Sequence, residues 1–186
     1  LILEIDERSL RAIHKVLPAI NLCISNLQKD QVQRNGDPDF IYRMFADTIT
    51  KDMTLFVNNE EPRSRGLEDF AGKVVYYSLE KNDKTYEKDD FYTVTLPCPK
   101  CNHKIKYDYY NIENIGKFKC TYCSYKSVEN PNVLITDINY KEKTFKCENE
   151  EYIVTYITPF YIYNYALCIA ICKQFDINYQ DIQKGF

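Results

Sequence analysis

The sequence predicts an α/β fold in which a mainly parallel sheet is interrupted by a small β-rich insertion. Short apolar runs alternate with stretches of helical spacing between residues 1 and 79, and this alternation is typical of strand–helix–strand units. Two Cys-x2-Cys pairs lie between residues 98 and 123, where the alternation stops. A hairpin pattern and a helical run follow, so we expect the sheet to begin before the insertion and to resume after it.

Four strands and three helices are expected before the insertion. The strands are predicted at residues 1–5, 21–25, 53–57 and 74–78, and the helices at residues 7–17, 39–49 and 64–70. Leu10, Ile13 and Leu17 recur at helical spacing in the first helix, and Asp39 is a candidate N-cap of the second. A polar loop at residues 27–38 connects the second strand to that helix.

Polar residues follow consecutive predicted strands. Glu4 and Asp6 close the first strand, Asn26 follows the second and Asn58 follows the third. Functional loops of parallel α/β sheets lie at the carboxyl ends of the strands, so these side chains are expected along one edge. Each has an ordinary alternative, because an acid at a strand end often caps a helix or faces solvent, and Asn58 also suits a turn.

The strongest motif is the pair Cys98-Pro-Lys-Cys101 and Cys120-Thr-Tyr-Cys123. Two such pairs at this separation are the pattern of a four-thiolate zinc site, because each short turn points two sulfurs at one position. Four thiolates close the coordination shell, so the zinc is expected to be structural, within a zinc ribbon at residues 91–128. Two disulfides or unrelated buried thiols are the alternative, and His103 is a rival candidate ligand.

The other four cysteines are expected to be core residues. Cys168 and Cys172 are four positions apart in a predicted helix and could share a metal, but free cysteines are commonly buried as small apolar side chains. The same interpretation applies to Cys23 and Cys147.

The chain after the insertion is expected to return to the sheet. Residues 134–140 and 144–157 alternate as a β-hairpin around residues 141–143, and residues 161–175 have the pattern of a buried helix. The uncharged run 153–172 is long enough to span a bilayer, but Pro159, Asn164 and recurrent tyrosines argue against an integral membrane segment. The predicted organisation is therefore residues 1–90, the insertion 91–128 and the return 129–186.

Composition sets the class of protein. The chain of 186 residues is 45% hydrophobic and 27% charged, which is ordinary for a globular domain. A net charge of −3 argues against a protein whose main partner is nucleic acid. The sequence has eight cysteines, four of them at the spacing of a metal site, and shows no secretory signal peptide. We therefore expect a reducing, cytoplasmic setting.

The motifs resemble, in order, the central ATPase domain of the Mur ligase family. The resemblance is carried by Leu-Glu-Ile-Asp-Glu at residues 3–7, by residues 24–36, and by Leu-Phe-Val-Asn-Asn-Glu-Glu-Pro at residues 55–62, where the family pattern ends L-N-A-D-D-P. The segments 98–103, 110–116 and 118–123 resemble the insertion of one Mur ligase-like group, and residues 163–167 and 175–177 resemble the Y-N-A-L helix and its exit. The resemblance implies the Mur ligase central fold with an inserted zinc ribbon.

The resemblance also implies an activity and its partners. Mur ligases use ATP to join amino acids or amines to peptidoglycan precursors. The group with this insertion activates the D-glutamate of the lipid II stem peptide as an acyl phosphate and amidates it to D-isoglutamine. Its ammonia comes from a GatD-type glutaminase, and the reaction takes place at the inner, cytoplasmic face of the membrane.

Matching the motifs residue by residue implies an ATP site with Mg²⁺. Glu4 matches the Mg²⁺-binding acid, a hard oxygen ligand suited to that ion. The other implied nucleotide-site residues are Asn26, Asp30, Gln31, Arg34, Asn58 and Asn164. Asn59-Glu-Glu61 replaces the family's A-D-D, Gln33 replaces an Asp, and Phe160 stands where a Gly is usual.

The resemblance leads us to expect a fragment of a longer ligase that is inactive by itself. The sequence contains no G-x-x-x-x-G-K-[ST] phosphate loop, which the family carries before the segment corresponding to Leu1. The alternative is a stand-alone zinc-ribbon module that binds nucleic acid or protein. Its support is a lysine cluster, although such a cluster is more typical of a solvated face; it consists of Lys100, Lys104, Lys106, Lys117, Lys119 and Lys126.

Overall fold

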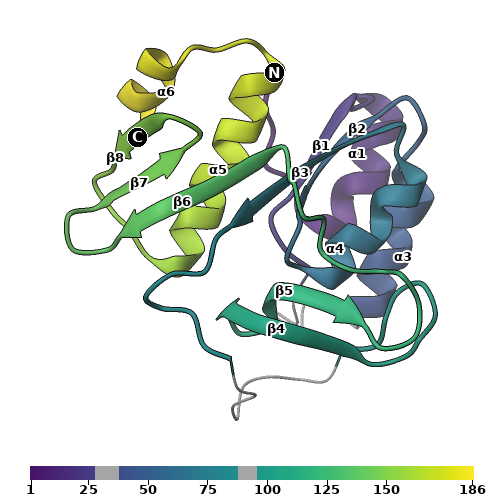
Figure 1. Ribbon diagram of the computed structural model, residues 1–186. Helices are drawn as coiled ribbons and strands as arrows, with labels where there is room; N and C mark the ends of the chain where they lie inside the picture. The colour runs from purple at the N-terminus through teal and green to yellow at the C-terminus, as the bar shows by residue number, and fades with distance from the viewer. Residues whose placement is uncertain (28–37, 88–95) are drawn as a thin grey trace.

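A six-stranded mixed sheet forms the centre of the molecule (Figure 1). The computed structural model describes residues 1–27, 38–87 and 96–186. The strand order is β1-β2-β3-β6-β7-β8. The strands are β1 (Asn21–Ile24), β2 (Thr54–Asn58), β3 (Lys73–Leu79), β6 (Val133–Asn139), β7 (Thr144–Cys147) and β8 (Glu150–Ile153). The first four are parallel and the last three form an antiparallel meander, which confirms the predicted mainly parallel sheet and its return after the insertion.

Helices cover both faces of this sheet because successive residues of a buried strand point in opposite directions. In β2, Leu55 and Val57 pack toward α1 (Leu10–Val16), α3 (Pro38–Thr48) and the 3₁₀ helix η2 (Gly66–Phe70). Phe56 points to the other face, where α5 (Pro159–Gln174) and α6 (Tyr179–Gly185) pack. The parallel part of the sheet is therefore the middle of three layers, as its continuous apolar runs predict.

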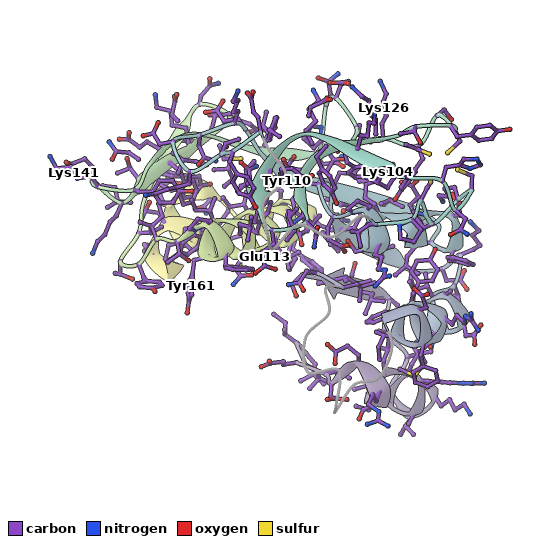
Figure 2. All side chains as sticks on the ribbon, turned by 90° about the horizontal axis from the view of Figure 1, so that it is seen from below. Lys104, Tyr110, Glu113, Lys126, Lys141 and Tyr161 are labelled. Atoms are coloured by element: carbon purple, nitrogen blue, oxygen red, sulfur yellow. The ribbon has the colours of Figure 1, made fainter. Side chains whose placement is uncertain are left out.

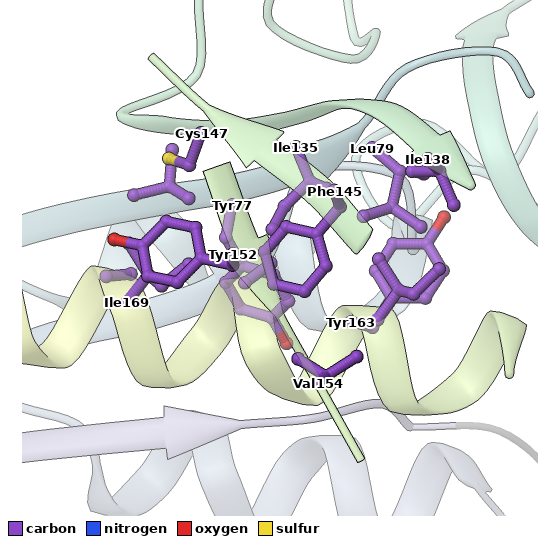
Figure 3. Close-up of a cluster of buried hydrophobic side chains, with 14 of the residues drawn as sticks. Tyr77, Leu79, Ile135, Ile138, Phe145, Cys147, Tyr152, Val154, Tyr163 and Ile169 are labelled. Carbon is purple, nitrogen blue, oxygen red and sulfur yellow. The ribbon is translucent and has the colours of Figure 1, made fainter. Parts of the chain in front are cut away.

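Phe145 lies at the centre of the core between the antiparallel meander and α5 (Figure 3). Its ring stacks on that of Tyr152 with a centroid distance of 5.3 Å, and on that of Tyr165 at 5.6 Å. Aromatic pairs at such distances add to the free energy gained by burial. The meander is thus held on α5 by side chains from β7, β8 and the helix itself.

The insertion between β3 and β6 forms a separate hairpin of β4 (Ile105–Ile112) and β5 (Ile115–Cys120). It lies against the end of the molecule that carries α3 and α4 (Pro62–Arg65) (Figure 1). Gly116 permits the tight pairing of its strands, because a Cβ atom there would lie 2.1 Å from the carbonyl oxygen of Tyr109. The chain between the two cysteine pairs, within the segment expected to be a zinc ribbon, therefore forms a hairpin.

The first predicted strand is wrong. Residues 1–6 have no regular structure, and Leu1 and Ile2 are almost fully exposed. A strand needs a hydrogen-bonded neighbour, and within the described part of the chain the sheet ends at β1. Asp6 instead caps the short helix η1 (Glu7–Ser9), with its carboxylate accepting from the backbone N–H of Arg8.

The prediction of one strand over residues 144–157 is also wrong, because this stretch contains two strands, β7 and β8. The chain turns at Glu148, whose φ of 56° is left-handed, and returns as β8. The pattern-based prediction missed this turn because residues on both sides continue the same alternation. It also missed α6, whose Asn178 accepts a capping hydrogen bond from the N–H of Asp181.

Among the described helices, none combines the length and the apolar character needed to cross a bilayer.

Candidate metal centre and the polar turn after β2

The four predicted cysteine ligands come together in one cluster. Their sulfur atoms all lie within 4.8 Å of one another, with 3.7 Å between Cys98 and Cys123 and 3.4 Å between Cys101 and Cys120. Zn–S bonds of about 2.3 Å in a tetrahedron place sulfur atoms about 3.8 Å apart. The cluster therefore has the donor set and the spacing of a closed metal site, and it can hold a metal ion.

Two tight turns present the sulfurs. In the first turn Asn102 adopts a left-handed φ of 63° and its N–H donates to the carbonyl of Cys98. In the second, the N–H groups of Tyr122 and Cys123 point at the Cys120 sulfur at 3.4 and 3.5 Å. Burial raises the pKa of the Cys120 thiol, but these N–H groups and the neighbouring thiols outweigh it and lower the pKa to about 6. A thiolate is the form that binds a metal.

The rival ligands lie elsewhere. His103 stacks on Tyr122 with ring centroids 4.0 Å apart, and its Nδ1 lies 3.0 Å from the carbonyl oxygen of Cys101. In the described residues, Cys168 and Cys172 are not part of any group of three metal-ligating side chains. Cys147 is buried as predicted, whereas Cys23 and Cys168 are exposed, so the prediction that these two are core residues is wrong.

The four-cysteine module, residues 96–128, docks on the chain that follows β2. The Tyr125 hydroxyl donates to the carbonyl of Pro62 at 2.7 Å. Arg65 is buried between the rings of Tyr76 and Tyr125, and its Nη1 donates to the carbonyl of Lys126. The sequence alone does not show what the insertion contacts, because these partners are about sixty residues apart in the chain.

The docking point is a polar turn, residues 58–61, at the carboxyl end of β2. All four of its side chains are buried. Asn58 accepts from the N–H of Glu60 through Oδ1, and its Nδ2 has no hydrogen-bond partner within the described structure. Glu61 caps α4 by accepting from the N–H groups of Arg63 and Ser64, and it also accepts from the N–H of Leu27. This turn therefore joins the ends of β1 and β2.

Glu60 connects the turn to three other elements. Its carboxylate accepts from the N–H of Leu79 at the end of β3, from Asn111 on β4 and from the hydroxyl of Tyr163 on α5. Its carbonyl accepts from the N–H of Gly116 on β5. Burial raises the pKa of Glu60 to about 7, and the hydrogen bonds only partly oppose this. The buried carboxyl is therefore partly protonated near neutral pH.

The predicted nucleotide-site residues are distributed around this edge of the sheet. Ile24 pairs with Val57, so Asn26 and Asn58 follow neighbouring strands at the same end. Asn164 follows Tyr163 on α5 and is exposed. Glu4 is exposed in the irregular N-terminal segment rather than at a strand end. The remaining predicted residues, Asp30, Gln31 and Arg34, lie outside the described residues.

Sequence reasoning missed Asn59, Glu60, Asn111 and Tyr163 as members of one network. Asn59 and Glu60 were visible only as departures from a family pattern, and nothing local marks Asn111. The signal that could identify them is the polarity of four consecutive residues directly after a buried strand. Such residues require partners when they are buried.

The lysine cluster is partly neutralised. Lys117 and Lys126 pair with Glu129, and Lys119 pairs with Asp108. Lys104 and Lys126 lie at the module end of the molecule, far from Tyr161 and Lys141 (Figure 2). The surface therefore carries alternating charges, as a solvated face does.

The sequence was compared with family models, curated proteins and solved structures. No family model matches it. The chain is 26% identical over 188 residues, its entire length, to "Lipid II isoglutaminyl synthase (glutamine-hydrolyzing) subunit MurT" of Staphylococcus aureus strain COL. The chain resembles MurT from end to end. The same subunit of Streptococcus pneumoniae R6 is 25% identical over 189 residues. The chain spans 42% of the length of these MurT relatives.

A solved structure supports the fold. A pseudomurein peptide ligase type C from Methanothermus fervidus superimposes with a TM-score of 0.75 at 20% identity, covering 94% of this chain and 35% of that protein. This likeness confirms the predicted fold of a Mur ligase-like domain. The MurT resemblance and this fold agree with the motif order found in the sequence.

Proposed function

We propose that this chain is part of an ATP-dependent ligase subunit that amidates the D-glutamate of lipid II to D-isoglutamine. The observation that carries the proposal is the similarity to MurT over the entire chain. The partner would be a GatD-type glutaminase that supplies ammonia, and the reaction would take place at the inner face of the membrane. Zinc-ribbon binding of nucleic acid is the less favoured alternative, because Lys100, Lys117, Lys119 and Lys126 of the cluster pair with acids.

The nucleotide would bind at the carboxyl edge of the sheet. Asn58 is supported by its buried amide, whose Nδ2 can donate to an acceptor on a ligand. Asn26 follows the neighbouring strand, and Asn164 lies on the exposed side of α5 next to Tyr163. Asp30, Gln31 and Arg34 are assigned to the same site by the resemblance alone. Ligand sites of open α/β sheets commonly occupy this edge.

Mg²⁺ and zinc would have different roles, the first in phosphoryl transfer and the second in folding. Glu4 is proposed to hold Mg²⁺, which binds through carboxylates and substrate phosphates and neutralises charge during phosphoryl transfer. The exposed position of Glu4 leaves its carboxylate accessible for this role. Cys98, Cys101, Cys120 and Cys123 are proposed to hold a structural zinc, because four thiolates leave no open coordination position.

The experiment is amidation of lipid II by the full-length protein with its glutaminase, glutamine and MgATP. Mass spectrometry distinguishes the product amide from the acid. Glu4→Gln should abolish amidation, because an amide is a poor ligand for Mg²⁺. Folding and zinc content should stay normal, and the exposed Glu150→Gln serves as the matched control.

Near-normal turnover of Glu4→Gln at saturating Mg²⁺ would remove Glu4 from the metal site. Failure of the wild-type complex to amidate lipid II would overturn the proposed reaction itself. A gel shift with nucleic acid at physiological salt would decide for the alternative.

A further inference from the structure

The polar turn and the four-cysteine module are joined by a pair of hydrogen bonds that resembles strand pairing. The Asn59 side chain donates from Nδ2 to the carbonyl of Val128 at 2.9 Å and accepts at Oδ1 from the N–H of Val128 at 2.8 Å. Arg65 also donates to Oδ1 at 3.1 Å. Asn59 is only 2% exposed, so these bonds are shielded from water.

We propose that the module positions the polar turn for nucleotide binding, with Asn59 as the positioning residue between them. The inference rests on the proposed function in one respect, the nucleotide bound beside Asn58. Asn59 does not itself contact the nucleotide, because its amide is bonded to Val128. It fixes the backbone from which its neighbour Asn58 presents an amide.

The position of Asn58 depends directly on its neighbours. Its Oδ1 is held by the N–H of Glu60, which leaves the buried Nδ2 as the donor of this amide that still lacks an acceptor. The N–H of Asn59 donates to the carbonyl of Tyr77, so the turn begins while the chain is still paired with β3. A change in the backbone of residues 59 and 60 therefore moves the Asn58 amide. Small displacements of a positioning group have large effects on binding and reaction geometry.

A second connection reaches the turn from the hairpin. The N–H of Gly116 donates to the carbonyl of Glu60 at 3.0 Å, and Asn111 donates to its carboxylate at 3.1 Å. Both donors belong to the β4–β5 hairpin. The module thus contacts two successive residues of the turn. Val128 bonds to Asn59, and Gly116 and Asn111 bond to Glu60.

The connection continues to the cysteine cluster. The N–H of Cys120 donates to the carbonyl of Tyr125 at 2.7 Å, and the Tyr125 hydroxyl donates to Pro62. Ser127 pairs with Phe118 through both its N–H and its hydroxyl, and Val128 follows directly. Residues 118–128 therefore form one short continuous segment that carries the end of the hairpin, two of the four cysteines and Val128, the partner of Asn59. Because metal binding and folding of such small modules are coupled, metal release should loosen the polar turn.

The test compares Asn59→Ala with Asn139→Ala in the full-length protein. Asn139 is a matched control, because its side chain also accepts from two backbone N–H groups but lies in the β6–β7 turn, away from the module. Hydrogen exchange of residues 58–61 reports the order of the turn without any ligand. Calorimetry with MgATP reports the affinity.

Asn59→Ala should speed exchange in residues 58–61 and weaken MgATP binding by roughly ten-fold, as expected for the loss of one or two buried hydrogen bonds. Asn59→Asp should fall between, because it keeps the acceptor for Val128 and loses the donor. Chelation of the metal from the wild-type protein should reproduce the faster exchange. Asn139→Ala should change neither quantity.

Unchanged exchange in Asn59→Ala would overturn the positioning role. Faster exchange with unchanged MgATP affinity would overturn it as well, because the contact would then be structural only. Absence of MgATP binding by the wild-type protein would instead refute the proposed function, and the exchange measurement would separate that result from a failure of the link between module and turn.

Discussion

Glu60 combines full burial with hydrogen bonds from three elements. Water would solvate a carboxylate better than this interior does, and for that reason the pKa is raised from 4.5 to about 7. Between these two pH values the folded protein retains a proton that the unfolded chain has released. Stability from this group is therefore complete below pH 4.5 and is lost as the pH rises toward 7.

Replacing Glu60 with Gln should remove this pH dependence. The free energy of unfolding of the wild-type protein should contain a component that falls between pH 4.5 and about 7, and Glu60→Gln should lack it. Urea denaturation across this range measures both. Glu150→Gln, at an exposed position on β8, should retain the wild-type slope, and an equal slope in all three proteins would contradict the assignment.

At this scale the sequence predicts ligands better than networks. The gathering of Cys98, Cys101, Cys120 and Cys123 in one cluster could be predicted because their spacing is local within each pair and chemically specific. The partners of Glu60 could not, because Asn111 and Tyr163 are about fifty and one hundred residues away. Their positions depend on how the hairpin and α5 pack, which no local pattern encodes.

The four-cysteine module is an element with a small core. Its buried apolar side chains beyond the cysteines are Ile105, Phe118 and Tyr125. So small a cluster buries too little surface to fold alone, and metal binding provides the missing free energy in modules of this size. The module should therefore depend on the metal more than the sheet does.

Cys120→Ser should release the metal and unfold the module while most of the sheet stays folded. Elemental analysis measures the metal, and hydrogen exchange measures protection in residues 96–128 and in β2 and β3 separately. Cys23→Ser, at an exposed cysteine outside the cluster, should keep full metal content. Stoichiometric metal in Cys120→Ser, or wild-type protein purified without chelator and lacking metal, would refute the four-thiolate site.

The antiparallel meander depends on one aromatic side chain. Phe145 is fully buried, so Phe145→Ala should destabilise the protein by about 3–5 kcal/mol through lost burial and a cavity. Phe175→Ala is a matched control at an exposed position after α5 and should cost much less. Thermal or urea unfolding measures both variants, and equal losses would show that the cluster is not the core of this part.

Elements were predictable where a pattern has a definite period and a definite end. α5 and strands β2 and β3 satisfy both conditions, since each is bounded by turn or capping residues. The run Leu1–Ile5 has the composition of a strand, but a strand also requires a partner in space. The turn at Glu148 breaks the prediction for the opposite reason, because two short strands share one uninterrupted alternation.

The arrangement of the whole molecule depends on where the insertion interrupts the sheet. β3 and β6 are adjacent and parallel, and the chain between them is the module rather than a helix. The sequence predicted the return to the sheet because the strand and helix patterns reappear after residue 128. It could not predict that the module also contacts the ends of β2 and α5, since those contacts join segments distant in the chain.

The parallel pairing of β3 with β6 also has a consequence for the order in which the protein assembles. The two strands can meet only after the chain between them has closed, and closing a long flexible segment slows folding. A hairpin that metal binding stabilises early shortens the flexible chain that must still close before β3 and β6 can pair. Until that happens, the open side of β3 is a template for pairing with other chains. Metal binding by the four cysteines should therefore influence how readily β3 and β6 pair, in addition to its effect on the final stability.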